Sequence, residues 1–188
     1  MTTAHILVVD DEADIRTLLK EILSEEGYEV DVAANAAQAR ASRAKQTPDL
    51  VLLDIWMPDV DGITLLREWS TTATNGCPVV MMSGHGTVET AVEATRLGAF
   101  DFVEKPLSLA KLLRTVERAL DAGKRKRQSG KLMQQLRSEL QQIAANPSSV
   151  LLIGEPGSGR EAFARFLHEQ SPRQAKPFVA LNTSSIPA

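Results

Sequence analysis

The stretch Ile6-Leu-Val-Val-Asp-Asp11 places two carboxylates directly after a short apolar run. Four further apolar runs follow along the chain, at residues 30–33, 50–53, 79–82 and 100–103. Between the runs, apolar residues recur at the spacing of an amphipathic helix, as at Ile15, Leu18, Leu19, Ile22 and Leu23. Short apolar strands that alternate with such helices predict a parallel sheet with both faces covered.

Five strand–helix repeats predict an α/β fold with a doubly wound, five-stranded parallel sheet of strand order 2-1-3-4-5. In this order the winding reverses between the first and third strands, and ligands bind beyond the carboxyl ends of those strands. Asp10 and Asp11 follow the first strand, and Asp54 ends the third. We therefore expect three carboxylates in one crevice.

Three carboxylates that lie close together repel one another, so the cluster predicts a bound cation. An open site made only of oxygen ligands favours Mg²⁺. Lys105 after the fifth strand and Ser83 at the end of the fourth are expected in the same pocket, where ammonium and hydroxyl groups can bind phosphate oxygens. Each residue alone is typical of a cap, a turn or the surface. Their grouping predicts phosphoryl transfer to a carboxylate nucleophile, Asp54.

Four blocks of the sequence resemble the signature blocks of two-component response-regulator receivers: Val8-Val-Asp-Asp-Glu-Ala-Asp-Ile-Arg16, Leu52-Leu-Asp-Ile-Trp-Met-Pro-Asp-Val-Asp-Gly62, Met82-Ser-Gly84 and Val103-Glu-Lys-Pro106. The resemblance covers roughly residues 4–120 and is greatest to NtrX-like members of the NtrC family. It implies a flavodoxin-like receiver domain. It also implies phosphorylation of Asp54 by the phosphohistidine of a sensor histidine kinase, here NtrY-like.

The resemblance also implies a role for each residue of the metal site. Asp11, Asp54 and the backbone carbonyl of Trp56 would bind Mg²⁺, and Asp10 would assist. Receivers of this type also catalyse their own dephosphorylation, at rates that the sequence does not show. Beyond that step, the resemblance implies a phospho-accepting regulator rather than an enzyme.

Two further residues match the switch of the receiver family. Ser83 matches the switch hydroxyl, and Phe102 matches the aromatic residue that turns inward once the hydroxyl has moved to the phosphate. Plain core packing is the alternative for Phe102. In this class the switching face consists of the fourth and fifth helices with the fifth strand, here roughly residues 87–97 and 107–120, which implies a homodimer.

Residues 121–147 are predicted to form a helical linker. The segment Gly123-Lys-Arg-Lys-Arg-Gln-Ser-Gly130 is basic, and such a run is more typical of a solvated linker or helix end than of a nucleic-acid patch. An apolar stripe then follows at 3-4-3 spacing: Met133, Leu136, Leu140 and Ile143. The stripe either extends the last receiver helix into a dimer seam or packs against the chain's own domain.

Residues 148–188 predict a partial P-loop-type βαβ segment. The pattern consists of a strand, a glycine-rich turn, a helix and a second strand, at residues 150–153, 154–159, 160–170 and 178–181. A segment of under 40 residues rarely folds unaided.

The glycine-rich turn contains Gly154, Gly157 and Gly159, and backbone N–H groups at such a helix start can hold an anion. Arg160 stands where a P-loop has lysine, and its guanidinium is larger and differently aimed. Residues 150–188 resemble the start of the AAA+ domain of sigma-54-dependent activators, in which that lysine is usual. Arg160 therefore puts ATP binding and hydrolysis by this chain in doubt.

The favoured function is two-component signal transduction with transcription regulation as the output. One alternative is the regulatory end of an ATP-dependent sigma-54 activator. The other, which Arg160 favours slightly, is a stand-alone truncated regulator that sequesters a kinase or an activator. A net charge of −3 offers no global attraction to DNA or a membrane, and the single cysteine fits a reducing compartment. No apolar run approaches the roughly 20 residues that span a bilayer, so cytoplasm is the expected location.

Overall fold

The computed structural model describes residues 3–71, 77–84, 88–146, 149–155 and 157–180 of the 188-residue chain. The chain divides into two compact units, residues 1–128 and 129–188. The predicted helix at 87–97 begins at a residue outside these ranges, and the predicted glycine-rich turn and second strand also extend outside them.

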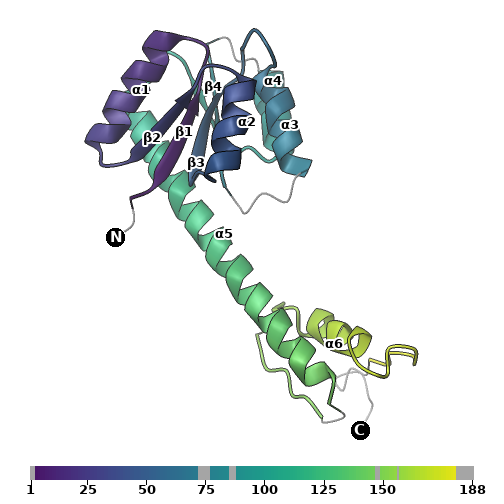
Figure 1. Ribbon diagram of the computed structural model, residues 1–188. Helices are drawn as coiled ribbons and strands as arrows, with labels where there is room; N and C mark the ends of the chain where they lie inside the picture. Colours follow the sequence, from purple (N-terminus) through teal and green to yellow (C-terminus); the bar gives the residue numbers. More distant parts are fainter. Residues whose placement is uncertain (1–2, 72–76, 85–87, 147–148, 156, 181–188) are drawn as a thin grey trace. The chain divides into compact units, whose positions relative to one another are not determined.

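The first unit contains a five-stranded parallel sheet with the order β2-β1-β3-β4-β5 (Figure 1). This order confirms the predicted flavodoxin-like topology. The strands are β1 (His5–Val9), β2 (Glu29–Ala33), β3 (Leu50–Asp54), β4 (Val79–Ser83) and β5 (Asp101–Glu104).

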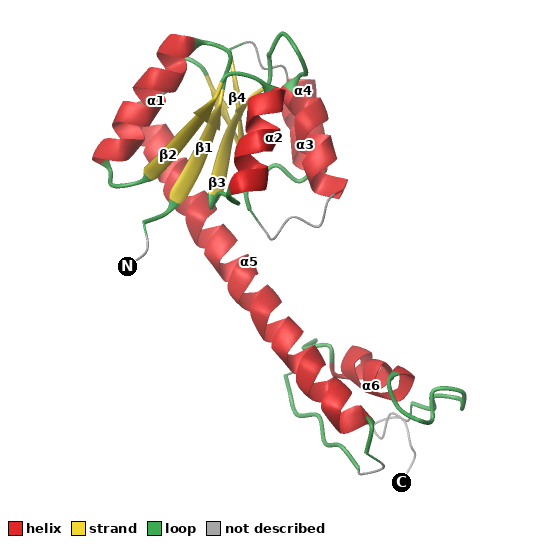
Figure 2. Ribbon diagram, in the orientation of Figure 1, coloured by secondary structure: helices red, strands yellow, loops and turns green. Residues whose placement is uncertain are grey.

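Helices cover both faces of the sheet (Figure 2). In the first unit they are α1 (Ala13–Glu25), α2 (Ala36–Lys45), α3 (Gly62–Thr71), α4 (Val88–Arg96) and the first part of α5 (Leu109–Ala144). Residues of α1 and α5 form one buried cluster with the sheet, and residues of α2, α3 and α4 form the other. The sheet is therefore the middle layer of three.

The strands belong to both buried clusters because their side chains alternate between the two faces. Ile6 and Val8 of β1 pack toward α1 and α5, whereas Leu7 and Val9 pack toward the opposite helices. All four side chains are fully buried. Burial of a large aliphatic side chain contributes about 2 kcal/mol, so continuous apolar runs stabilise a sheet that is covered twice.

Gly62, the first residue of α3, is required by close backbone packing at the end of β3. Its N–H donates to the carbonyl oxygen of Ile55 at 2.8 Å. A Cβ atom built at Gly62 would overlap the backbone carbonyl oxygen of Asp54. Asp61 caps the same helix start by accepting from the Thr64 N–H at 2.7 Å. The end of β3 and the start of α3 therefore hold each other in place.

Helix α5 is 36 residues long and runs without a break through the basic segment 123–130. Each glycine in a helix costs about 1 kcal/mol relative to alanine, and Gly123 and Gly130 do not end it. The helix ends at Ala144, close to the end of the linker predicted at residues 121–147. In the described ranges, no helix combines the length and the apolar character that crossing a membrane requires.

The second unit contains α6 (Arg160–Glu169), which confirms the predicted helix within one residue. The predicted flanking strands are wrong for the described residues, since 150–153 and 178–180 form no strand. A strand needs a hydrogen-bonded neighbour, and these segments do not pair with each other. In the linker stripe, Leu140 is buried within the chain, whereas Met133 and Ile143 are substantially exposed.

Candidate functional site

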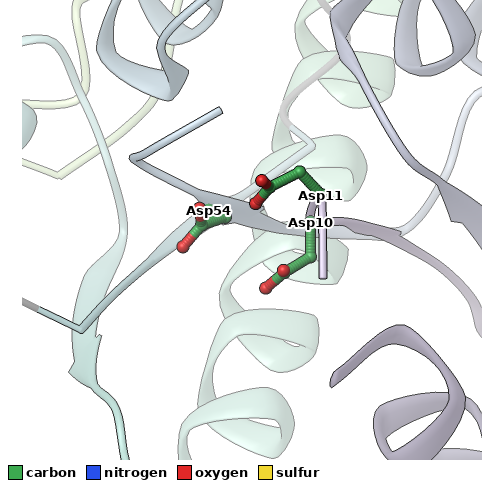
Figure 3. A group of neighbouring side chains, drawn as sticks. All are labelled: Asp10, Asp11 and Asp54. Carbon is green, nitrogen blue, oxygen red and sulfur yellow. The ribbon is translucent and has the colours of Figure 1, made fainter. Parts of the chain in front are cut away.

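The strand order brings three carboxylates together at one edge of the sheet. Asp10 and Asp11 follow β1, and Asp54 is the last residue of β3. One carboxylate oxygen from each residue lies within 4.8 Å of the other two (Figure 3). Asp10 and Asp54 are buried and Asp11 is exposed. The prediction that these three carboxylates lie close together is confirmed.

The donor set of this cluster fits Mg²⁺. All three groups are carboxylates, and Asp11 is exposed to solvent. A groove of about 410 Å³ adjoins the cluster, lined by Glu12, Ile15, Asp54, Trp56, Gly84, Lys105 and Pro106. Mg²⁺ prefers one or two carboxylates and keeps room for water or phosphate oxygens. The backbone carbonyl of Trp56 as a further ligand stays a prediction.

Lys105 is bound by three carboxylates at the mouth of the cluster. Its Nζ lies 2.8 Å from Asp10 Oδ2, 3.0 Å from Asp54 Oδ1 and 3.2 Å from Glu12 Oε1. The backbone N–H of Lys105 donates to the Ser83 carbonyl at 2.7 Å, which ties the residue after β5 to the end of β4. The Lys105–Pro106 peptide bond is cis. The predicted pairing of Lys105 with Asp54 is present.

Glu12 carries no sequence signal that predicts a function. Glu12 is the residue before α1, and 93 positions separate it from Lys105. The local pattern predicts only a helix start at this point. Its one unusual feature is the residue type, because Ser, Thr, Asp and Asn are preferred at such a position.

Burial and the Lys105 ammonium act in opposite directions on the pKa of Asp54. Burial raises the pKa of Asp54 to about 6; Lys105 opposes the rise, and the carboxylates of Asp10 and Asp11 add to it. Burial lowers the pKa of Lys105, but its hydrogen bonds to Asp10 and Asp54 outweigh burial and raise it. At neutral pH the pocket therefore holds an ionised Asp54 carboxylate beside the charged Lys105 ammonium.

Ser83 and Phe102 lie on adjacent strands. Ser83 ends β4 as a fully buried residue and is aligned with Glu104 of β5. Phe102 is aligned with Met81 and packs, half-buried, against the cluster on the side of α2, α3 and α4. That packing agrees with the plain core alternative for Phe102. The switch roles of both residues stay predictions.

The predicted anion-binding turn lies in the second unit. Gly157 and Gly159 adopt positive φ angles of 80° and 81°. Gly159 is the N-cap of α6 and Arg160 is the first residue of the helix, with an exposed side chain. Both glycines have a conformation that a side chain would strain. The roles of Gly154, Gly157, Gly159 and Arg160 in binding stay untested.

Two protein families match the chain. Residues 6–117 match the response regulator receiver domain family, and residues 127–188 match the sigma-54 interaction domain family. The two matches together cover most of the chain and follow the order that the sequence predicted.

Curated relatives match over nearly the whole chain. The nitrogen assimilation regulatory protein NtrX of Azorhizobium caulinodans is 40% identical over 97% of this chain, and the regulatory protein AtoC of Escherichia coli is 38% identical over 97%. In both cases the aligned part is 44% of the relative's own length. This chain therefore spans less than half the length of these relatives.

Solved structures agree with these matches. The structure of NtrX from Brucella abortus in complex with ATP is 43% identical, with a TM-score of 0.65, over 99% of this chain and 45% of that chain. The receiver domain of the same protein is 50% identical, with a TM-score of 0.58, over 62% of this chain and 98% of that chain. This chain belongs to the response-regulator receiver family, and the beginning of a sigma-54 interaction domain follows its receiver domain.

Proposed function

We propose that the first unit accepts a phosphoryl group on Asp54 from the phosphohistidine of a sensor histidine kinase of NtrY-like type. The observation that carries the proposal is the contact of 3.0 Å between Asp54 Oδ1 and Lys105 Nζ, beside the carboxylates of Asp10 and Asp11. A buried, ionised carboxylate next to a fixed ammonium and an open cation site is suited to attack on phosphorus.

The proposed transfer exchanges one bond to phosphorus for another. A carboxylate oxygen of Asp54 forms a new P–O bond, the P–N bond of the phosphohistidine breaks, and its electron pair stays on the imidazole nitrogen. Mg²⁺ held by Asp10, Asp11, Asp54 and the Trp56 carbonyl would neutralise phosphoryl charge. Lys105 donates to the phosphoryl oxygens, and the Ser83 hydroxyl supplies a further donor.

The proposed output is a change in dimerisation and, through it, in transcription regulation in the cytoplasm. In the proposed switch, Ser83 moves toward the phosphoryl group and Phe102 turns inward, and this movement changes the dimer contact made by the face of α4, β5 and α5. The linker part of α5 extends that contact. The match to the sigma-54 interaction domain supports transcription as the output.

Labelling by acetyl phosphate with Mg²⁺ tests the proposed phospho-acceptor. The 188-residue chain is expected to gain one phosphoryl group, and Asp54→Asn is expected to lose it, because an amide oxygen is a poor nucleophile. Asp121→Asn removes an exposed carboxylate from α5 and serves as the matched control, with full labelling expected. Undiminished labelling of Asp54→Asn would contradict the proposal.

A second candidate function is the regulatory end of an ATP-dependent sigma-54 activator. The match at residues 127–188 and the similarity to an ATP-bound NtrX structure favour it. Nucleotide titration of the chain separates the candidates, because micromolar ATP binding would support an active nucleotide site despite Arg160. We expect no such binding. A stand-alone regulator that sequesters a kinase or activator is distinguished by whether a stop codon follows Ala188 in the gene.

A further inference from the structure

Glu12 occupies the N-cap position of α1 without capping the helix. Its side chain makes no hydrogen bond to the first turn. Glu12 Oε1 instead accepts from Lys105 Nζ at 3.2 Å. Glutamate is a poor N-cap, because its side chain is longer than those that reach back to the first N–H groups. The contact with Lys105, rather than helix capping, therefore accounts for where this side chain lies.

Among the three carboxylates on Lys105, Glu12 differs in place and exposure. Asp10 and Asp54 belong to the cation cluster and are buried, whereas the Glu12 side chain is 61% exposed and lies outside the cluster. A divalent cation at the cluster neutralises the charges of Asp10 and Asp54 and weakens their hold on the ammonium. Glu12 does not belong to the cluster, so the cation reduces the attraction between Glu12 and Lys105 less than it reduces the attraction of Asp10 or Asp54 for Lys105.

We propose that Glu12 is a positioning residue that holds the Lys105 ammonium at the rim of the pocket and competes with the phosphoryl group for it. The inference rests on the proposed phospho-acceptor function and adds a component to it. Lys105 must leave Glu12, in part or fully, to donate to phosphoryl oxygens. Glu12 therefore lowers the affinity of the loaded cluster for a phosphoryl group.

Two substitutions separate the contact from the charge. Glu12→Gln removes the charge and keeps the length of the side chain. Glu12→Asp keeps the charge but shortens the side chain by one methylene group, which breaks the 3.2 Å contact and places a preferred N-cap residue before α1. If holding Lys105 needs both the charge and the reach of Glu12, both variants weaken the hold on the ammonium. If only the charge matters, Glu12→Asp behaves as the unaltered protein does.

Binding of beryllofluoride, an analogue of the phosphoryl group, tests the inference by isothermal titration calorimetry on the full chain at saturating Mg²⁺. At low ionic strength, Glu12→Gln is expected to bind the analogue roughly two- to fivefold more tightly, and Glu12→Asp more tightly as well. At about 0.5 M salt the difference should shrink, because the pair is partly exposed. Asp14→Asn, an exposed carboxylate in the first turn of α1, is the matched control and should bind unchanged.

The outcomes distinguish the inference from the function on which it rests. Equal or weaker binding by Glu12→Gln, with normal binding by the unaltered protein, would overturn the competition and leave the phospho-acceptor standing. A Glu12→Asp variant that matches the unaltered protein would overturn the role of the contact. Failure of the unaltered protein to bind beryllofluoride, together with failure to be labelled by acetyl phosphate, would overturn both. A purely structural role predicts weaker binding in each variant, the opposite of the expected gain.

Discussion

Arg127 Nη2 lies 2.8 Å from Asp49 Oδ1, and Asp49 directly precedes β3, the strand that ends at Asp54. The second carboxylate oxygen of Asp49 accepts from the backbone N–H of His5 at 2.8 Å. The edge of the sheet opposite the carboxylate cluster is thus bound to α5 within the first unit. One residue of the basic run therefore has a specific partner, although the sequence indicated only a solvated linker or helix end.

Breaking this contact from either side is expected to give unequal losses. Arg127→Ala removes one partly exposed ion pair and should lower the free energy of unfolding by about 0.5–1 kcal/mol. Asp49→Ala also leaves the His5 N–H without its acceptor and should cost about 1–3 kcal/mol. Urea unfolding measures both. Arg125→Ala, at an exposed position two residues away, is the control and should change little; equal losses at Arg125 and Arg127 would contradict the pairing.

Gly62→Ala is expected to disturb the pocket of Asp10, Asp11 and Asp54 through the backbone. The new methyl group would overlap the Asp54 carbonyl oxygen, so β3 or α3 must shift, at a cost of about 1–3 kcal/mol. Mg²⁺ affinity should fall with stability, since Asp54 moves. Gly130→Ala makes the same change inside α5 where nothing lies within 4 Å, and it should raise stability by up to about 1 kcal/mol. A Gly62→Ala protein with normal stability would show that the close approach is absent.

The raised pKa of Asp54 predicts that, in the absence of divalent cations, this group lowers the free energy of unfolding by an amount that depends on pH. Its pKa rises from 3.8 in an exposed carboxyl to about 6 in the fold, so the folded state binds more protons than the unfolded state between these values. Stability contributed by this group therefore falls as pH rises from about 4 to 6. Asp54→Asn removes the cost and should be more stable than the unaltered protein at pH 7, by on the order of 1–3 kcal/mol.

Chemical unfolding at several pH values with EDTA checks this sign. The advantage of Asp54→Asn should be present near pH 7 and vanish near pH 4, where the carboxyl is protonated in both states. Addition of Mg²⁺ should reverse the order, because only the aspartate protein keeps the complete cluster. An advantage of the asparagine variant that grows toward low pH would refute the assignment.

Cys77 is expected to be unreactive in the folded protein. Burial raises the pKa of its thiol to about 11, although the nearby charges of Arg43 and Arg127 lower it in part. The thiolate is the reactive form, so alkylation at pH 8 should be roughly 100-fold slower than for an ordinary cysteine. Iodoacetamide labelling followed by mass spectrometry measures the rate, with the urea-unfolded chain as control. Equal rates in the two states would contradict the partial burial of this side chain.

Much of the first unit was predictable because its signals are local. Continuous apolar runs indicate strands that are buried on both faces of the sheet, and a carboxylate that ends such a run lies at the edge where ligands bind. Asp10, Asp11 and Asp54 could therefore be grouped before their distances were known. The strand predicted at 150–153 was wrong because this signal, too, is local. An apolar run indicates only a tendency to form a strand, and a strand forms only where a second segment pairs with it by hydrogen bonds.

The sequence by itself determined the order of the strands, the place of the three carboxylates and the family of the receiver, because periodicity and motif spacing are properties of short segments. Only the tertiary structure decided that Glu12 contacts Lys105 across 93 positions and that Arg127 contacts Asp49. Neither pair follows from a local pattern. Such contacts depend on which surfaces the packed helices and strands bring together. Their strength depends on how far burial increases the attraction between the opposite charges.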